Sequence, residues 1–365
     1  MNDVSSMMLL GIGTAGCAVA NGVCRAFGGP LRCVLADTDA VSAVDGVPFV
    51  LFGGDRLSGR GAGGNIVSGR LAAEDSVRSL DDHLKGVRLV VIVTALGGGT
   101  GGGATLEVCK YLKVHGVPSI VFATMPFRFE GEDCQRNARG VMSMIEDVSA
   151  TTFFIPLDKL VGDAERMDDA MRRAVDTLAG AVTLFWRLVE KPGYLRLDVE
   201  RIRRIASGAG RGRFAVITTR GEGRAEQAVD TLLRSELLAT AAGSVKSALC
   251  GILAGEDLLL TEVGRIADGI RGSFDVASFD LATVNDEDTF SGRISVVVML
   301  FEAVGKPDES SLPGSAMNPK RRKPRGVLAV GPTGRGRFNK VEPTIWNGED
   351  LDVPTFIRRG ISIDM

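Results

Sequence analysis

Residues that build metal centres are scarce in this sequence. It holds two histidines, His83 and His115, and six cysteines scattered without a CxxC pair, which argues against a zinc cage. Both histidines fall near expected turns, where we expect solvated side chains rather than catalytic ones. The cysteines stand mostly among apolar neighbours, and we interpret them as buried free thiols of a cytosolic protein. We therefore expect no metal site built from the chain's own side chains.

Long apolar runs, an excess of basic residues and a secretory leader are also missing. No apolar run reaches the roughly 18 residues that a membrane helix needs. The 43 Lys and Arg residues are balanced by 45 Asp and Glu residues, which argues against a dedicated nucleic-acid binder. Residues 1–4 lack the basic start of a secretory signal. We expect a cytoplasmic protein with no specific nucleic-acid partner.

Short apolar runs alternate with helical patterns over the first 160 residues. Such alternation predicts a parallel sheet with helices on both faces, and strands covered on both faces are apolar throughout. The strands that we expect are residues 7–10, 34–36, 89–93, 119–123 and 153–155.

The second half of the chain has a different pattern. Met171, Val175, Leu178 and Val182 recur at helical spacing, which predicts one apolar face of a long helix ended by residues 191–193. Further strands and one helix then predict an α+β domain. The expected fold class is thus α/β: a Rossmann-like parallel-sheet domain, a long core helix and an α+β C-terminal domain. The later strands that we expect are residues 214–218, 249–253, 277–282 and 294–300.

Glycine is abundant, with 47 residues, and its placement is informative. Residues 97–103 read GGGTGGG and stand between a buried strand and a helical run. Without side chains, backbone N–H groups can approach an anion closely, and the positive end of the following helix lies at the same place. Thr100 adds a hydroxyl group. A flexible linker would not stand between a strand and a helix, so the pattern predicts phosphate binding.

Two other glycine loops follow expected strands or precede helices. Residues 11–16 fit GxGxxG, with Asp37 or Asp39 at the distance expected for a ribose contact, which keeps an NAD-dependent oxidoreductase open as an alternative. Residues 59–65 form a third loop. A dinucleotide site needs no additional long glycine loop, and the sequence has no evident hydride-transfer set. The Walker pattern GxxxxGK[ST] is absent, which argues against a P-loop enzyme.

Several motifs, in order, resemble those of the tubulin/FtsZ family. GGGTGGG resembles the signature GGGTG[ST]G, with Gly102 where the family has Thr or Ser. Residues 58–76 are similar to the stretch with the GAGxNP loop, and MPFRFEG at 125–131 is similar to KPFxFEG. IPLDKL at 155–160 resembles IPNDKL, and DLDVPTFIRR at 350–359 resembles the C-terminal peptide that docks membrane-tethering partners. The resemblance covers nearly the whole chain.

The resemblance implies a cytoskeletal GTPase of cell division that polymerises head to tail. GTP would lie on one subunit, and an acidic loop of the next subunit would activate the attacking water. It implies GTP and GDP as cofactors, with Mg²⁺ as a candidate companion, and a homopolymer or a co-polymer with a second FtsZ. A membrane-tethering division protein would bind residues 349–359 and bring the chain to the division site. The implied parts are a GTPase domain at 1–165, a core helix at 166–192, an activation-type domain at 193–302, a linker at 303–343 and a docking peptide at 344–365.

Family roles can be transferred to matching positions of this chain. They comprise phosphate contacts, a guanine contact, site-lining residues, γ-phosphate neighbours and a ribose contact. The implied phosphate contacts are Gly11, Gly13, Gly16, Gly97, Gly98, Gly99, Thr100 and Gly101. The implied guanine contact is Asn21, and the implied site-lining residues are Thr38 and Asp39. Ala62 and Gly63 would lie near the γ-phosphate, and Glu130 would contact the ribose.

The parts of the family pattern that read the base are altered here. The Asn of IPNDKL is Leu157, and the base-reading position of the core helix falls on Val175, with Asp176 beside it. The ribose-side Arg falls on Cys134, with Arg136 nearby. Losing polar partners of this kind costs roughly 1–3 kcal/mol each, so we expect weaker base specificity.

The catalytic loop is altered as well. Residues 196–201, RLDVER, match the family's NxDFAD, so Asp198 keeps the first acidic position while Arg201 occupies the second. Glu200 is the reserve acid. Asp198 could instead simply cap a helix that starts near residue 199. We expect an FtsZ-like GTPase with slow, assembly-dependent hydrolysis, and the main alternative is a nucleotide-binding or apo filament paralogue with little turnover.

Overall fold

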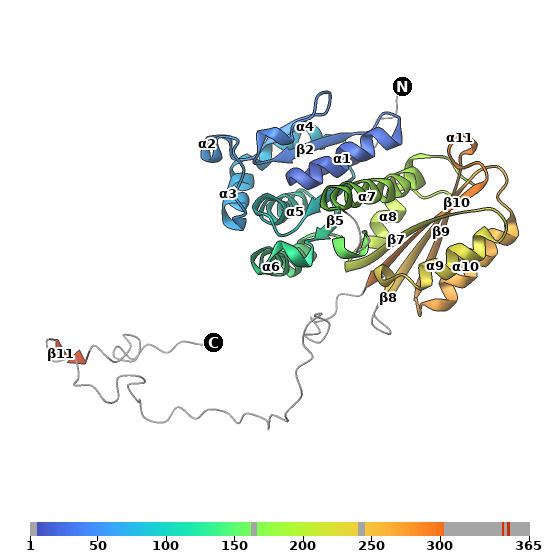
Figure 1. Cartoon of the computed structure of the whole chain (residues 1–365). Coiled ribbons are helices and arrows are strands. Elements are labelled where there is room, and N and C mark those ends of the chain that lie inside the picture. The colour runs from blue at the N-terminus through green and yellow to red at the C-terminus, as the bar shows by residue number, and fades with distance from the viewer. Residues whose placement is uncertain (1–5, 162–165, 240–244, 303–344, 347–348, 351–365) are drawn as a thin grey trace. The chain divides into compact units, whose positions relative to one another are not determined.

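The computed structural model describes residues 6–161, 166–239, 245–302, 345–346 and 349–350 (Figure 1). The chain divides into two compact units, Met1–Pro307 and Asp308–Met365. In the second unit, β11 (Ile345–Trp346) pairs antiparallel with β12 (Glu349–Asp350). The expected linker at 303–343 and most of the expected docking peptide at 344–365 lie outside the described residues. No helix within the described part is long and apolar enough to cross a membrane.

The first half alternates strands and helices as its sequence pattern predicts. Its strands are β1 (Met7–Ile12), β2 (Cys33–Asp37), β3 (Phe49–Leu51), β4 (Leu89–Ala95), β5 (Ser119–Met125) and β6 (Thr151–Pro156). Its helices are α1 (Gly13–Phe27), α2 (Gly54–Leu57), α3 (Ile66–Ser76), α4 (Asp81–Leu84), α5 (Thr105–Val114) and α6 (Glu132–Val148). All pairings among the six strands are parallel, in the order β3-β2-β1-β4-β5-β6.

Successive residues of the buried strands point to opposite faces of this sheet. In β1, Met7 and Leu9 join one apolar core with α1, whereas Met8 and Leu10 join another core with α3, α5 and α6. Each strand therefore needs apolar residues at every position, which is why the continuous runs predict the strands well.

The second half continues the same sheet, which the sequence pattern did not predict. Its strands are β7 (Gly210–Arg220), β8 (Val245–Ala254), β9 (Ser278–Asn285) and β10 (Arg293–Glu302). β7 pairs parallel with β6, then antiparallel with β10, giving ten strands in the order β3-β2-β1-β4-β5-β6-β7-β10-β8-β9. Its helices are α8 (Val199–Ala206), α9 (Arg224–Leu233), α10 (Leu260–Ser273) and α11 (Glu287–Phe290).

The long helix α7 (Met167–Glu190) joins the two halves and lies against α1 (Figure 1). Its Phe185 belongs to a cluster of aromatic rings with Phe122, Phe153 and Phe214, which come from both halves of the sheet. The expected apolar face is confirmed for Leu178 and Val182, which are buried.

One position expected on the apolar face of the long helix is more exposed than the pattern indicates. Met171 of α7 is 43% exposed because it faces a surface cavity near the start of the helix. The mixed, mainly parallel sheet with helices on its faces confirms the expected fold class.

Candidate functional site

Four loops meet at the carboxyl edge of the parallel strands. We name residues 11–16 loop 1, residues 38–42 loop 2, residues 59–65 loop 3 and residues 97–103 loop 4. Loops 1, 2 and 4 follow β1, β2 and β4, which are neighbours in the sheet, and loop 3 precedes α3. In open parallel sheets this edge is where ligands bind, so the topology brings the three glycine-rich segments together.

Loop 4 needs its glycines because backbone approaches backbone. A Cβ atom at Gly99 would lie 2.6 Å from the Asn65 oxygen of loop 3. Side chains at Gly101 and Gly103 would overlap the carbonyl oxygens of Ala95 and Ile66. The chain then enters a π-helical turn, Thr100–Ala104, a local irregularity that often marks functional sites.

Gly98 differs from these glycines. It is exposed, and a Cβ atom there would meet no other atom within 4 Å. Its substitution would therefore change the open space beside loop 4 and leave the packing intact.

Loop 1 turns β1 directly into α1. Gly13 has φ +74°, and a Cβ there would lie 3.3 Å from the backbone nitrogen of Gly101 in loop 4. Gly11 and Gly16 have packing roles, because a Cβ at Gly11 would lie 2.8 Å from the Ala20 side chain and one at Gly16 would overlap the Val93 oxygen. The helix start thus sits close against β4, with its positive end at the loops.

A buried carboxylate connects loop 1 with loop 2. Asp37 is 1% exposed, and its Oδ2 accepts hydrogen bonds from the hydroxyls of Thr14 at 3.0 Å and Ser42 at 2.5 Å. Its Oδ1 accepts from the Thr38 amide at 2.7 Å. With its oxygens engaged inside the protein, Asp37 does not present a carboxylate to a ribose, so Asp39 is the one residue left for the ribose contact that the oxidoreductase alternative requires.

Loop 2 is in turn joined to loops 3 and 4. The hydroxyl oxygens of Thr38 and Thr100 lie 2.6 Å apart. The Gly61 amide donates a hydrogen bond to the backbone carbonyl oxygen of Thr38 at 3.0 Å. Asp39 is half-buried and caps a short turn through the Val41 amide. Ala62 and Gly63 lie in loop 3, where Gly63 is exposed and a Cβ on it would meet no atom within 4 Å.

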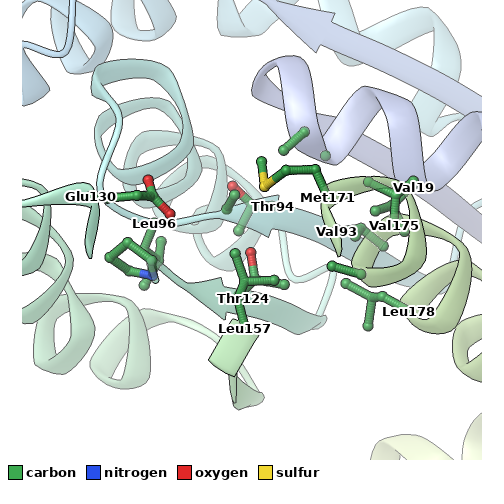
Figure 2. Close-up of a pocket in the computed structure, with 15 residues that line it drawn as sticks. Val19, Val93, Thr94, Leu96, Thr124, Glu130, Leu157, Met171, Val175 and Leu178 are labelled. Carbon is green, nitrogen blue, oxygen red and sulfur yellow. The ribbon is translucent and has the colours of Figure 1, made fainter. Parts of the chain in front are cut away.

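An apolar cavity of about 120 Å³ lies beside loops 1 and 4 (Figure 2). It is bounded by the first turns of α1, the carboxyl ends of β4 and β5, and α7. Figure 2 shows Met171, Val175 and Leu178 of α7 on one side. Its lining residues are Ala15, Gly16, Val19, Val93, Thr94, Ala95, Leu96, Thr124, Pro126, Glu130, Leu157, Met171, Ala174, Val175 and Leu178.

The cavity gathers some of the predicted base and ribose positions. Glu130 and the substituted positions Leu157 and Val175 line it, whereas Asn21 is half-buried on α1 outside its lining. Asp176 is exposed and is not part of the lining, so it does not replace the polar group missing at Val175.

The predicted catalytic acids lie elsewhere. Asp198 is the N-cap of α8, where its Oδ1 accepts from the Arg201 amide at 2.7 Å, as expected for a helix cap. Glu200 forms ion pairs with Arg88 and Arg203, both at 2.8 Å. Arg88 immediately precedes β4, so Glu200 lies at the amino edge of the strands and loop 4 at their carboxyl edge.

All six cysteines are free; four are buried, whereas Cys24 and Cys134 are half-buried. Burial raises the pKa of the Cys17 and Cys109 thiols to about 12. Among the described residues, no group of three or more His, Cys, Asp or Glu side chains is placed to hold a metal ion.

The fold and the clustered loops define an α/β protein with glycine-rich segments at the carboxyl edge of a parallel sheet. A model of the GTPase domain of the Tubulin/FtsZ family matches residues 6–165, and a model of the C-terminal domain of the FtsZ family matches residues 210–301. The chain belongs to the tubulin/FtsZ family. Membership of a GTPase-domain family implies GTP and GDP as ligands.

Individual relatives agree with this assignment. The chain is 28% identical to the cell division protein FtsZ of Magnetospirillum gryphiswaldense over 340 residues, which cover 90% of this chain and 60% of that protein. It is 28% identical to cell division protein FtsZ 1 of Pyrococcus abyssi over 296 residues, covering 80% and 79% of the two chains.

Solved structures show the same architecture. An empty FtsZ dimer from M. jannaschii matches with a TM-score of 0.75 and 25% identity, covering 82% of this chain and 88% of that chain. A GTPγS-bound protofilament of CetZ2 from Haloferax volcanii matches with a TM-score of 0.68 and 22% identity, covering 80% and 92%. The second likeness concerns the fold alone.

Asp37 is a site residue whose role the sequence did not reveal, and it gives a direct test. We expect Asp37→Ala to destabilise the protein by about 1–3 kcal/mol, because three donors lose their acceptor. Affinity for GTP should fall as loops 1 and 2 lose their connection. Asp37→Asn keeps one carbonyl acceptor and should retain most of both properties. Urea unfolding midpoints and GTP titrations measure these effects, and an Ala variant equal to the parent in both would contradict them.

Proposed function

We propose that this protein binds GTP on loops 1 to 4, assembles head to tail into protofilaments and acts in cell division on the cytoplasmic side of the membrane. The observation that carries the proposal is that loops 1 to 4 and the acidic segment with Asp198 and Glu200 lie at opposite edges of one sheet. Each subunit would then hold half of a hydrolytic site at either end. A head-to-tail contact is heterologous and open, so it generates filaments.

The distance between loop 4 and the acidic segment supports a hydrolytic site shared between two subunits. Arg88, the ion-pair partner of Glu200, stands before β4, and loop 4 begins two residues after β4 ends. At about 3.3 Å per strand residue, the seven residues of β4 alone span roughly 23 Å. A water-positioning group must come within hydrogen-bond reach of its proton or water. Asp198 and Glu200 would therefore serve the nucleotide of a neighbouring subunit.

The contacts of the acidic segment favour slow turnover. Arg201 occupies the second acidic position of the resembling motif, and its Nε donates to Asp280 Oδ1 at 2.7 Å. Glu200 is held by two arginines of its own chain. Asp198 is exposed and keeps one oxygen for another donor beside its helix-capping bond. With a single carboxylate available to orient the attacking water, the activation barrier to GTP hydrolysis should be higher than with two carboxylates.

A filament protein with little or no hydrolysis is the second candidate function. Glu200 pairs with Arg88 and Arg203, and Arg201 pairs with Asp280, all within one chain. These contacts favour a filament protein with little hydrolysis over a fast GTPase. In either case Mg²⁺ would be held mainly by phosphate oxygens, because Mg²⁺ in nucleotide sites keeps waters and uses only one or two protein groups. Residues 349–359 would dock a membrane-tethering division partner, and a second FtsZ could join the polymer.

Gly98 tests whether loop 4 binds phosphate. We expect Gly98→Val to abolish GTP binding while the unfolding midpoint stays close to that of the parent, because the new side chain enters open space beside the loop. Gly180→Ala on α7, where a Cβ also meets no atom within 4 Å, serves as the control. Isothermal titration with GTP measures the result, and unchanged affinity in the Val variant would refute phosphate binding at loop 4.

Asp198 tests the intermolecular mechanism. Phosphate release per subunit should rise with protein concentration in the parent and fall by about tenfold or more in Asp198→Ala and Asp198→Asn. Asn is as good an N-cap as Asp, so the Asn variant separates loss of the carboxylate from loss of the helix cap. A parent rate per subunit that stays flat with concentration would mean that one chain holds a complete site.

The C-terminal peptide tests the partner proposal. Deleting residues 349–365 should leave light scattering from GTP-induced polymers unchanged and remove recruitment to the membrane in cells. Val353, Phe356 and Ile357 are the apolar residues expected to anchor the partner, and they lie outside the described residues. If recruitment survives the deletion, the tail is not the docking site, and the basic run at 320–323 becomes the candidate.

A further inference from the structure

The cavity beside loops 1 and 4 adjoins the proposed phosphate site directly. It shares Gly16 with loop 1, and its Leu96 immediately precedes loop 4. A ligand whose phosphates lie on these loops would place its neighbouring group at the mouth of this cavity or within it. The chemistry of the lining therefore decides what kind of group is accepted there.

The lining offers few polar groups to a ligand. Among the residues that the structure describes, Thr94, Thr124 and Glu130 are the only polar side chains of the lining. The Thr94 hydroxyl already donates to the Gly101 oxygen at 3.1 Å and accepts from Thr105 at 3.0 Å. An oxygen of Glu130 accepts from the Phe127 amide at 2.8 Å. The donors and acceptors along a base edge would find little to bond within this cavity.

The rest of the cavity lining is apolar and suits the flat face of an aromatic ring. From α7 come Met171, Ala174, Val175 and Leu178, which recur at helical spacing and line one side (Figure 2). The volume of about 120 Å³ is somewhat below that of an apolar cavity of about 150 Å³ that holds benzene, so the cavity has room for about one ring of a base, with the remainder at its mouth. Methionine sulfur makes favourable contacts with aromatic rings and adapts to their shape. A ring would be held by contact area and not by hydrogen bonds.

We propose that this cavity takes the base of a nucleoside triphosphate without reading its identity, so that the protein accepts purine nucleotides as a class. The inference rests on the proposed binding of a triphosphate to loops 1 to 4. Sites built to hydrogen-bond a ligand group reject analogues by about 10⁴–10⁵-fold, whereas apolar pockets discriminate by about 10²-fold or less. GTP, ITP and ATP should therefore bind the parent with affinities within about tenfold of one another.

The test is a set of titrations of the full-length protein with GTP, ITP, ATP and inorganic tripolyphosphate. Val175→Asp supplies an acceptor for the N–H groups of guanine and should raise the preference for GTP over ATP by about tenfold or more, since adenine presents an acceptor at the corresponding ring nitrogen. Val175→Leu keeps the lining apolar and should leave the preference unchanged. Leu157→Asn provides an independent polar substitution if the Asp variant does not fold.

The contribution of ring contact is measured with Met171→Ala. This variant should weaken GTP and ATP by the same factor and leave tripolyphosphate binding unchanged, while Met171→Leu should retain the parent affinities.

A parent that prefers GTP over ATP by more than about tenfold, while still binding tripolyphosphate, overturns the inference and leaves the proposed function standing. A parent that binds no triphosphate and no tripolyphosphate overturns the proposed function and the inference together. Similar affinities for the three nucleotides, with selectivity gained in the polar variants, support the inference.

Discussion

The backbone of loop 4 lies in direct contact with the end of β4 and the first turn of α3, and the organisation of the whole carboxyl edge depends on this contact. Side chains at Gly99, Gly101 or Gly103 would push these segments apart. Because they are held together, Thr100 reaches Thr38, and Thr38 is in turn fixed by Asp37. The glycines thus let the backbones of four loops approach one another closely, and Gly98 alone of loop 4 is exposed at their surface.

The two ends of the parallel strands differ in their side chains. At the carboxyl edge, loops 1 to 4 are joined by hydrogen bonds of Asp37 and Thr38. The cavity beside them is lined mainly by apolar side chains, and at the amino edge Glu200 pairs with two arginines of the same chain. Under the proposed function, this arrangement would let nucleotide occupancy support assembly more than turnover.

Local patterns predicted those parts of the fold that local sequence determines. Continuous apolar runs located the strands of the parallel sheet, because both faces of those strands are buried. The glycine spacing located loops 1, 3 and 4. The pairing of β6 with β7 could not be predicted, since it joins segments nearly 60 residues apart through only three residues on each strand. Asp37 resembled a ribose-binding residue in the sequence, and only the positions of Thr14 and Ser42 show that its carboxylate faces inward.

The opposite placement of loop 4 and Glu200 also bears on mechanics. If subunits join through these two ends, the filament axis runs along the strands of the parallel sheet. Tension along the filament would then load the covalent backbone of β1 and β4, and the hydrogen bonds between strands would lie across the direction of pull. Such a subunit resists stretching far better than one whose strands must separate. The parallel sheet would therefore act as the stiff element of the polymer, and bending would concentrate at the contacts between subunits.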